Sequence, residues 1–141
     1  HPQLLLEEFD ITDAVSVYNV VSKHQPCEIY NLAAQSHVHT SFEQPDYTFR
    51  VNALGVQYFL DGIKYFSPNN KFITCSTSEM FGANYDMIQG VKAQNENTAF
   101  LPQSPYSIAK LAAHNSIRLY LYNGFTVWIV CFNLCSQCVG R

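Results

Sequence analysis

Short apolar runs alternate with longer amphipathic segments along this 141-residue chain. The apolar runs predict buried β-strands over residues 27–32, 71–75 and 125–132. The segments with apolar residues at helical spacing predict helices over 12–25, 45–66 and 105–122. Strands that alternate with helices are typical of right-handed β-α-β units. We therefore predict an α/β fold with a parallel, doubly wound, Rossmann-like sheet.

The positions of turn and helix-cap residues agree with the predicted bounds of the strands and helices. Thr12 and Asp13 mark a helix start, Pro26 ends that helix, and Pro105 stands in the first turn of the last helix. Residues 82–103 are polar and rich in Asn, Gly and Pro, so we expect them to be irregular. No internal repeat or low-complexity segment interrupts the pattern.

Polar residues gather where the predicted strands end. Asp10, residues 31–36, residues 77–79 and Asn133 all follow directly after apolar runs. In open α/β sheets, ligands bind outside the carboxyl ends of the strands. The pattern therefore predicts a ligand site at this edge of the sheet.

A tyrosine and a lysine four residues apart form a candidate catalytic pair in the predicted last helix. Tyr106 and Lys110 share one helix face at this spacing. A free tyrosine has a pKa of about 10 and is a poor base at neutral pH. Because a positive charge favours the phenolate, we expect Lys110 to lower the pKa of Tyr106.

A hydroxyl and a carboxylate stand at the end of the preceding strand. Thr77 and Glu79 are two residues apart, so in an extended segment they point to the same side. Taken singly, Glu79 is explained as a solvated loop acid and Y-x-x-x-K as a surface pair. The order of the motifs, an apolar strand ending in Ser-Thr-Ser-Glu and then Ser-Pro-Tyr-x-x-x-Lys, favours a site for proton transfer at a substrate hydroxyl.

The composition narrows the function class. Hydrophobic residues make up 48% of the chain, which is ample for a core, and 8 basic residues face 11 acidic ones. Without a polycationic patch, nucleic-acid binding is not expected. No apolar run approaches the about 20 residues of a membrane span, and no signal peptide opens the sequence. We expect a cytoplasmic protein that binds neither membranes nor nucleic acid.

The five cysteines do not change this picture. Cys27 and Cys75 lie in apolar runs and are expected to be buried free thiols. Cys131, Cys135 and Cys138 have a spacing compatible with metal binding, but no second Cys or His pair follows to complete a tetrahedral site. We therefore predict no metal.

Several motifs together resemble one family over nearly the whole chain. They are EIYNLAAQSHV at 28–38, STSEMFG at 76–82, SPY at 104–106, AKL at 109–111 and Phe-Asn at 132–133. In this combination they are similar to the GDP-mannose 4,6-dehydratase family of the extended short-chain dehydrogenase/reductase superfamily.

The resemblance implies a redox-neutral elimination that converts GDP-mannose to GDP-4-keto-6-deoxymannose with NADP, a step in nucleotide-sugar metabolism that leads to GDP-fucose. It implies that Tyr106 takes the proton from the sugar 4-hydroxyl, that Thr77 bonds the same oxygen, and that Glu79 removes the proton from carbon 5. Lys110 is implied to bind the nicotinamide ribose and to tune Tyr106. The full-length protein is expected to be a homo-oligomer.

The resemblance also assigns binding residues one at a time. Asn133 is implied to lie near the sugar nucleotide. The implied cofactor contacts are Asp10, Ile11, Leu32, Ala33, Ala34, Gln35, Ser36, Tyr47, Tyr106 and Lys110.

The sequence departs from the family pattern in two places. No G-x-x-G-x-x-G turn precedes Leu4, and a family His and Arg that contact the cofactor fall on Leu134 and Val139. We therefore expect residues 1–141 to be a partial NAD(P)-binding domain that is incomplete at both ends. It lacks the glycine-rich strand-turn-helix and the substrate domain, and we expect it to be inactive in isolation. The alternatives are another nucleotide-sugar 4,6-dehydratase or epimerase, or an inactive chain that serves as a binding or oligomerisation subunit.

Overall fold

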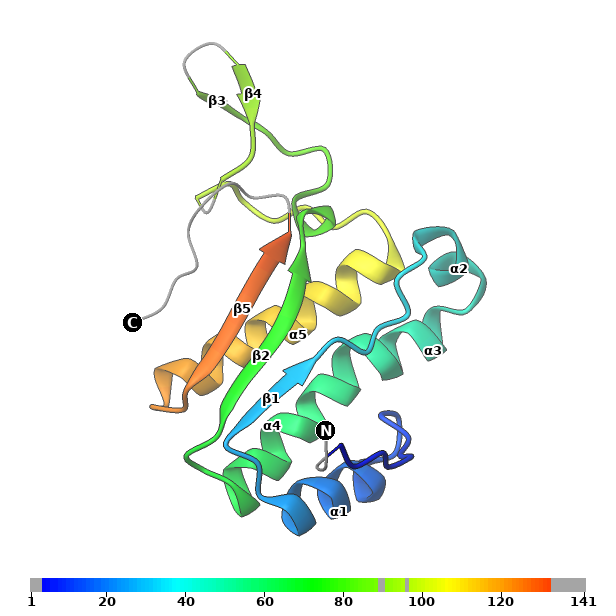
Figure 1. The fold of residues 1–141 in the computed structure, drawn as a ribbon. Coiled ribbons are helices and arrows are strands. Elements are labelled where there is room, and N and C mark those ends of the chain that lie inside the picture. Colours follow the sequence, from blue (N-terminus) through cyan, green and yellow to red (C-terminus); the bar gives the residue numbers. More distant parts are fainter. Residues whose placement is uncertain (1–3, 89–90, 96, 133–141) are drawn as a thin grey trace.

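A three-stranded parallel sheet forms the centre of the computed structural model, which describes residues 4–88, 91–95 and 97–132. Its strands are β1 (Glu28–Asn31), β2 (Lys71–Thr77) and β5 (Val127–Phe132), in the order β1-β2-β5 (Figure 1). The register aligns Tyr30 with Ile73 and Ile73 with Trp128. The predicted parallel α/β fold is confirmed, and the strand ends agree with the sequence pattern to within two residues.

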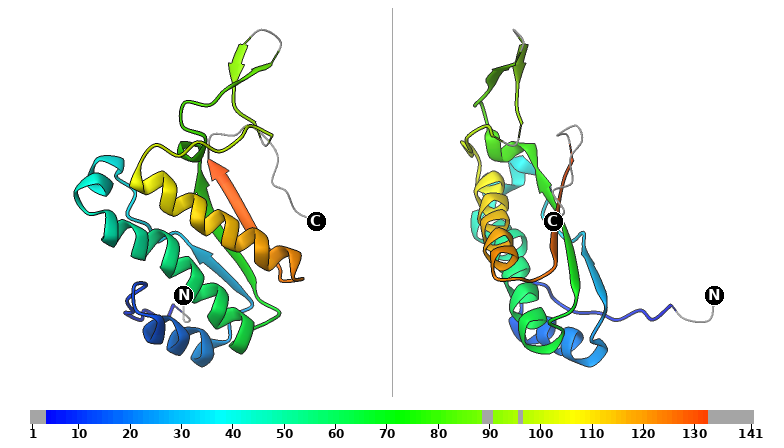
Figure 2. Two further views of the ribbon diagram at one scale, coloured as in Figure 1. Left: turned by 180° about the vertical axis from the view of Figure 1, so that it is seen from behind. Right: turned by 90° about the vertical axis from the view of Figure 1, so that its left-hand side faces the viewer.

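The long helices pack together on one side of this sheet, as the right-hand view of Figure 2 shows. They are α1 (Ala14–His24), α4 (Gly55–Phe66) and α5 (Pro105–Tyr122). Asp13 caps α1 by accepting hydrogen bonds from the backbone N–H groups of Val15 and Ser16. The helix starts predicted from the sequence are therefore confirmed for α1 and α5.

The core lies between the helices and the sheet. Phe72 on β2 is fully buried, and the side chains around it are aliphatic or aromatic. Burial of such side chains is the main favourable contribution to folding. The buried members of the cluster are Val17, Val21, Val56, Phe59, Leu60, Ile63, Phe72, Ala113, Ile117 and Val127.

Three segments differ from the prediction. The helix expected over 45–66 is divided into α3 (Pro45–Phe49), a π-helical turn (Arg50–Leu54) and α4. The segment expected to be irregular contains a short antiparallel hairpin, β3 (Asp86–Ile88) with β4 (Val91–Ala93). A short helix, α2 (Val38–Glu43), had no sequence signal of its own, and the His37 side chain caps it by accepting from Thr40 N–H.

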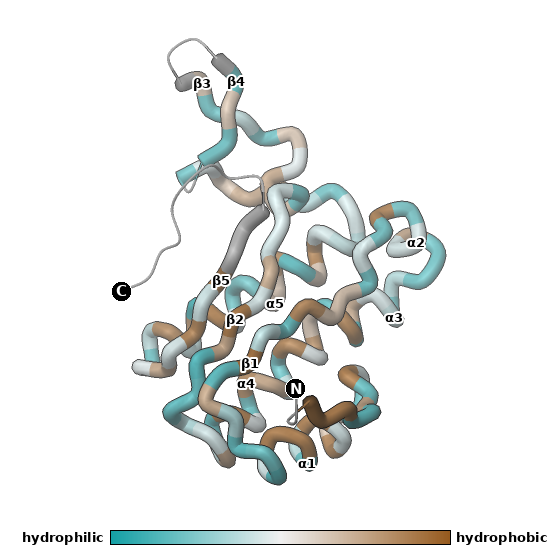
Figure 3. Tube along the Cα trace, in the orientation of Figure 1, coloured by the Kyte–Doolittle hydropathy of each residue, from teal (hydrophilic) through white to brown (hydrophobic). Residues whose placement is uncertain are grey.

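The opposite face of the sheet carries exposed apolar side chains. Tyr30 and Trp128, which share one row across the strands, are exposed there, and the apolar run Leu4–Leu6 near the N-terminus in Figure 3 is also exposed. Cys27 is exposed and Cys75 only half-buried, so the expectation of two buried thiols is wrong. Cys27 precedes the paired part of β1 and thus lies outside the core. Within the described ranges, no helix is long and apolar enough to cross a membrane.

Candidate active site

The backbone turns sharply where β2 ends. Thr77 is the last residue of β2, and Ser78–Phe81 forms a single 3-10 turn. The Thr77 hydroxyl accepts a hydrogen bond from the backbone N–H of Glu79 at 3.2 Å and so caps this turn. The expectation that Thr77 and Glu79 lie in one extended segment is therefore wrong, because the chain leaves the extended conformation directly after Thr77.

The turn ends at a glycine that the backbone requires. Gly82 has a positive φ of 54°, which favours glycine. A Cβ atom there would lie 2.1 Å from the carbonyl oxygen of Leu101. Leu101 N–H in turn donates to the Met80 carbonyl at 2.9 Å. The turn that carries Glu79 is thus fixed against the segment leading into α5.

A reciprocal cap sets the start of α5. The Ser104 hydroxyl accepts from Ser107 N–H at 3.1 Å, and the Ser107 hydroxyl accepts from Ser104 N–H at 2.9 Å. Pro105 occupies the first turn, where its missing N–H costs no hydrogen bond. This cap fixes Tyr106 in the first turn of the helix, next to the end of β2.

Tyr106, Thr77 and Glu79 come together at this point. The Tyr106 side chain is largely buried, and burial raises the pKa of its phenol. The neighbouring Thr77 hydroxyl opposes this rise, while the negative charge of Glu79 adds to it. The expected lowering of the Tyr106 pKa is therefore not seen, because desolvation outweighs the favourable contact.

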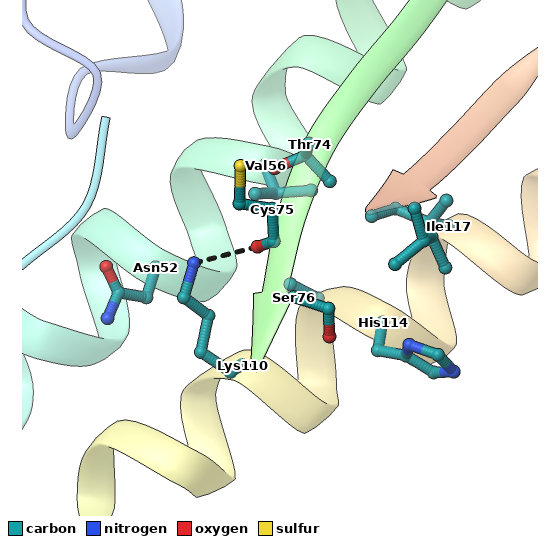
Figure 4. Close-up of a pocket in the computed structure, with 10 residues that line it drawn as sticks. Asn52, Val56, Thr74, Cys75, Ser76, Lys110, His114 and Ile117 are labelled. Carbon is teal, nitrogen blue, oxygen red and sulfur yellow. Dashed lines mark hydrogen bonds between the residues drawn. The ribbon is translucent and has the colours of Figure 1, made fainter. Parts of the chain in front are cut away.

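Lys110 lies one turn further along α5 and points toward β2. Its ammonium group donates to the backbone carbonyl of Cys75 at 3.0 Å (Figure 4). This carbonyl lies just beyond the last paired residue of β1, since Asn31 is aligned with Thr74. Only 8% of Lys110 is exposed, and burial lowers the pKa of its ammonium. Two N–H donors of Lys110 remain for other acceptors.

The loop after β1 is fixed from the helix side. Asn52 accepts from Gln35 N–H at 2.9 Å and donates to the Gln35 carbonyl at 2.8 Å. Asn31 accepts from Ala33 N–H at 3.2 Å, which tightens the same loop. Leu32, Ala33, Ala34 and Ser36 are exposed, whereas Gln35 is half-buried and donates to the His37 carbonyl. The loop therefore presents mostly exposed residues at the carboxyl end of β1.

The remaining predicted cofactor residues lie in different environments. Asp10 is exposed, and its carboxylate accepts from the Thr12 backbone and hydroxyl at 2.8 Å each, which lowers its pKa. Ile11 packs against the core beside Gly55, where a Cβ atom would lie 2.7 Å from the Ile11 side chain. Tyr47 on α3 is half-exposed. Among the described residues, no hydrogen bond or ion pair joins these three side chains to Tyr106, so their shared role stays a prediction.

The predicted substrate contact and the cysteines with metal-like spacing fall mainly outside the described residues. Asn133, the predicted substrate contact, lies outside the described residues, as do Cys135 and Cys138. Among residues 4–88, 91–95 and 97–132, no three His, Cys, Asp or Glu side chains gather in an arrangement suited to a metal ion.

Asn52 is the main residue that pattern reasoning missed. It is 1% exposed, and it lies in the π-helical turn between α3 and α4. Such turns occur frequently at functional sites. The only signal in the sequence is a polar amide among the apolar residues Val51, Ala53 and Leu54. The Ser104–Ser107 cap was also readable, as a serine three residues before another serine around Pro105.

This arrangement brings a hydroxyl, a phenol, an ammonium and a carboxylate to one end of the sheet. The Thr77 oxygen accepts from Glu79 N–H, which leaves the Thr77 hydroxyl proton to be donated to a neighbouring oxygen such as that of Tyr106. Tyr106 is within the influence of both Thr77 and Glu79. Such a set can move a proton at a substrate oxygen and accept a second proton nearby.

The sequence matches known proteins along nearly its whole length. Residues 1–140 match the family described as GDP-mannose 4,6 dehydratase. A GDP-mannose 4,6-dehydratase of Yersinia enterocolitica is 38% identical over 133 residues, which cover 88% of this chain and 34% of that protein. One of Sinorhizobium fredii is 43% identical over 107 residues, covering 74% of this chain and 29% of that protein. The chain thus spans about a third of the length of these curated relatives.

The fold has solved counterparts. The UDP-glucose 4-epimerase of Brucella ovis in complex with NAD superposes with a TM-score of 0.73 at 25% identity, covering 89% of this chain and 36% of that one. The structural likeness shows the Rossmann-like architecture, and the family match covers the part of the chain that contains the candidate site. The chain therefore belongs to the GDP-mannose 4,6-dehydratase family.

Proposed function

We propose that this chain carries the catalytic residues of an NADP-dependent GDP-mannose 4,6-dehydratase, a hydro-lyase that forms GDP-4-keto-6-deoxymannose and water. The observation that carries the proposal is the convergence of Thr77, Glu79 and Tyr106 at the end of β2, with Lys110 one turn behind. Membership of the family supports the substrate, and the NAD complex of the Brucella epimerase supports a nicotinamide dinucleotide.

The residues at the site fit such a cofactor. The loop Leu32–Ser36 is held at Gln35 by Asn52, and Lys110 has two donors left for ribose oxygens. When bound, NADP supplies a reversible hydride acceptor. Asp10, Ile11 and Tyr47 complete the proposed cofactor contacts, and Asn133 remains the proposed substrate contact.

Each catalytic side chain has a distinct task in this proposal. Tyr106 takes the proton of the sugar 4-hydroxyl, and Thr77 donates a hydrogen bond to the same oxygen. Glu79 removes the acidified proton from carbon 5 and assists the loss of water from carbon 6. The raised pKa of Tyr106 means that contacts made by the bound ligands must favour the phenolate before it acts as a base.

The wider features of the protein form part of the same proposal. We infer that residues 1–141 are a portion of a Rossmann-like nucleotide-binding domain, and that the whole enzyme is a cytoplasmic homo-oligomer. An epimerase is an alternative with the same fold, but a carboxylate beside Tyr106 is needed only for elimination. A chain without the glycine-rich turn should show little or no turnover alone, since positioning accounts for many orders of magnitude of rate.

Glu79→Gln tests the dehydratase assignment in an enzyme of the relatives' length that contains this chain. Glutamine keeps the size of the side chain but cannot accept the proton from carbon 5. We expect the reduced cofactor and the bound 4-keto sugar to accumulate without loss of water, as seen by nicotinamide absorbance in a single turnover and by mass analysis. Formation of the 6-deoxy product at the normal rate would refute the proposal.

A further inference from the structure

His114 on α5 has a buried nitrogen whose hydrogen-bonding capacity is unused. Its Nδ1 has no hydrogen-bond partner among the described residues and is shielded from solvent. The ring packs edge-on against Phe100, with the ring centroids 5.3 Å apart. Buried polar nitrogens are rarely left without a partner in folded proteins. We therefore expect the Nδ1 atom of His114 to have a hydrogen-bond partner that is not a protein group.

A small cavity is lined in part by His114. It lies between β2, the π-helical turn and α5, and its lining includes Thr74, Ser76, Lys110 and His114 (Figure 4). The space for a solute is about that of one water molecule. A cavity of this size with polar groups in its wall is suited to a bound water rather than to an empty void.

The Ser76 hydroxyl is the second group with capacity to spare. It donates to the sulfur of Met80 at 3.4 Å, and its oxygen lone pairs accept from no donor among the described residues. Thr74 and Asn52, in contrast, already bond backbone groups of the β1 segment. A water in the cavity can donate one proton to Ser76 Oγ and the other to an imidazole nitrogen, so that both acceptors gain a hydrogen-bond partner.

We propose that the cavity binds one water molecule that bridges His114 Nδ1 and Ser76 Oγ. His114 then carries its proton on Nε2, and the water links α5 to the residue that precedes Thr77. Burial and the nearby charge of Arg118 lower the pKa of His114, which keeps the ring neutral and leaves Nδ1 an acceptor. Resting on the proposed function, this makes His114 a positioning residue for the strand end at Thr77.

A double-mutant cycle between the two residues tests the bridge in an enzyme of the relatives' length that contains this chain. The variants are His114→Phe, Ser76→Ala and the double change, and the measurement is the unfolding equilibrium constant from urea titrations. The effects of two residues in one hydrogen-bond network are not additive. We therefore expect the change in the unfolding equilibrium constant of the double variant to be at least about threefold smaller than the product of the changes in the two single variants. His114→Phe combined with Ser22→Ala on α1 is the control pair. Its effects on the free energy of unfolding should be additive. Additive behaviour of the Ser76 pair would overturn the bridge.

Two further histidine variants sharpen the result. The amide of Asn places a polar atom near the position of Nδ1, whereas that of Gln places one near Nε2. We expect His114→Asn to keep the coupling with Ser76 and His114→Gln to lose it. Equal behaviour of the two variants would contradict a bridge through Nδ1.

The tautomer provides a check that needs no variant to fold. Nitrogen-15 spectra of the wild-type ring should show a neutral imidazole with the proton on Nε2 at neutral pH. A proton on Nδ1 would overturn the proposed arrangement. If the Glu79 test fails while the coupling persists, the dehydratase assignment is wrong and the water site stands.

Discussion

The amino-terminal end of the sheet is packed with apolar side chains, whereas its carboxyl-terminal end is built from buried polar groups. Phe72, the second residue of β2, and Val127, the first residue of β5, lie inside the hydrophobic cluster together with residues of the regular helices α1 and α4. At the other end, Asn52, Ser107 and Lys110 are buried and hydrogen-bonded to backbone atoms. The backbone there is irregular, with a π-helical turn on one side and a 3-10 turn on the other.

This difference shows how stability and chemistry are divided along the strands. Apolar packing is non-directional and is compatible with regular helices. A site that holds protons must aim individual atoms, so it needs directional hydrogen bonds and backbone turns that regular helices do not provide. The carboxyl end of the sheet is therefore the part in which a substitution should change activity more than stability.

Tyr106→Phe should give the largest effect and act on activity. The ring remains in place but can no longer accept the substrate proton, so kcat should fall by about 10²–10⁴-fold in an enzyme of the relatives' length. Tyr122→Phe, at an exposed position of the same helix, is the matched control and should leave kcat near wild type. Steady-state product formation measures both. Near wild-type dehydration by the Tyr106→Phe variant would show that another residue is the base.

Phe72→Ala should give the opposite pattern at the amino-terminal end. The side chain is fully buried, so its removal leaves a cavity and should lower the free energy of unfolding by about 3–5 kcal/mol. Tyr65→Ala, at an exposed position on α4, should cost far less. Urea unfolding of an enzyme of the relatives' length that contains this chain compares the two. A loss no larger than that of the Tyr65→Ala variant would argue against a close-packed core at this end.

Asn52→Leu tests whether the polar end also contributes to stability. The change leaves Gln35 N–H and C=O without their partner and should cost about 1–3 kcal/mol. Asn19→Leu on the exposed side of α1 is the control. Amide exchange at Gln35 should rise selectively in the Asn52→Leu variant. Unchanged exchange would mean that the loop after β1 is held by other contacts.

Tyr120→Phe should have the smallest effect, and that effect depends on pH. The Tyr120 hydroxyl donates to Asp61 at 2.5 Å, and burial, followed by this bond, raises its pKa from 10.0 to about 12. Because the folded-state pKa is raised, the stabilisation is complete below pH 10 and is lost as the pH rises toward about 12. We expect a loss of about 1 kcal/mol at neutral pH that shrinks across this window.

Urea titrations at neutral and alkaline pH measure this dependence. Tyr85→Phe, at an exposed position outside α5, is the control and should show no such window. A constant difference between the Tyr120→Phe variant and wild type at all pH values would contradict the assigned bond.

Local patterns in the chain were sufficient to predict the order of the three parallel strands and of the long helices α1, α4 and α5, and the bounds of α5. They also indicated Thr77, Glu79, Tyr106 and Lys110 as candidate residues, whose roles stay predictions. These features depend on periodicity and on short motifs, which are present in the chain without reference to distant contacts. The hairpin β3–β4 was not predicted, because its strands are only three residues each in a polar segment.

How the site is fixed became visible only in the folded chain. The clamp of Asn52 on Gln35 joins residues 17 positions apart, and the bond of Lys110 to Cys75 joins residues 35 positions apart. The direction of the Tyr106 pKa shift also depends on the fold, because desolvation depends on which side chains from other elements cover the phenol. Sequence spacing sets which groups share a helix face, but burial and long-range contacts set what those groups can do.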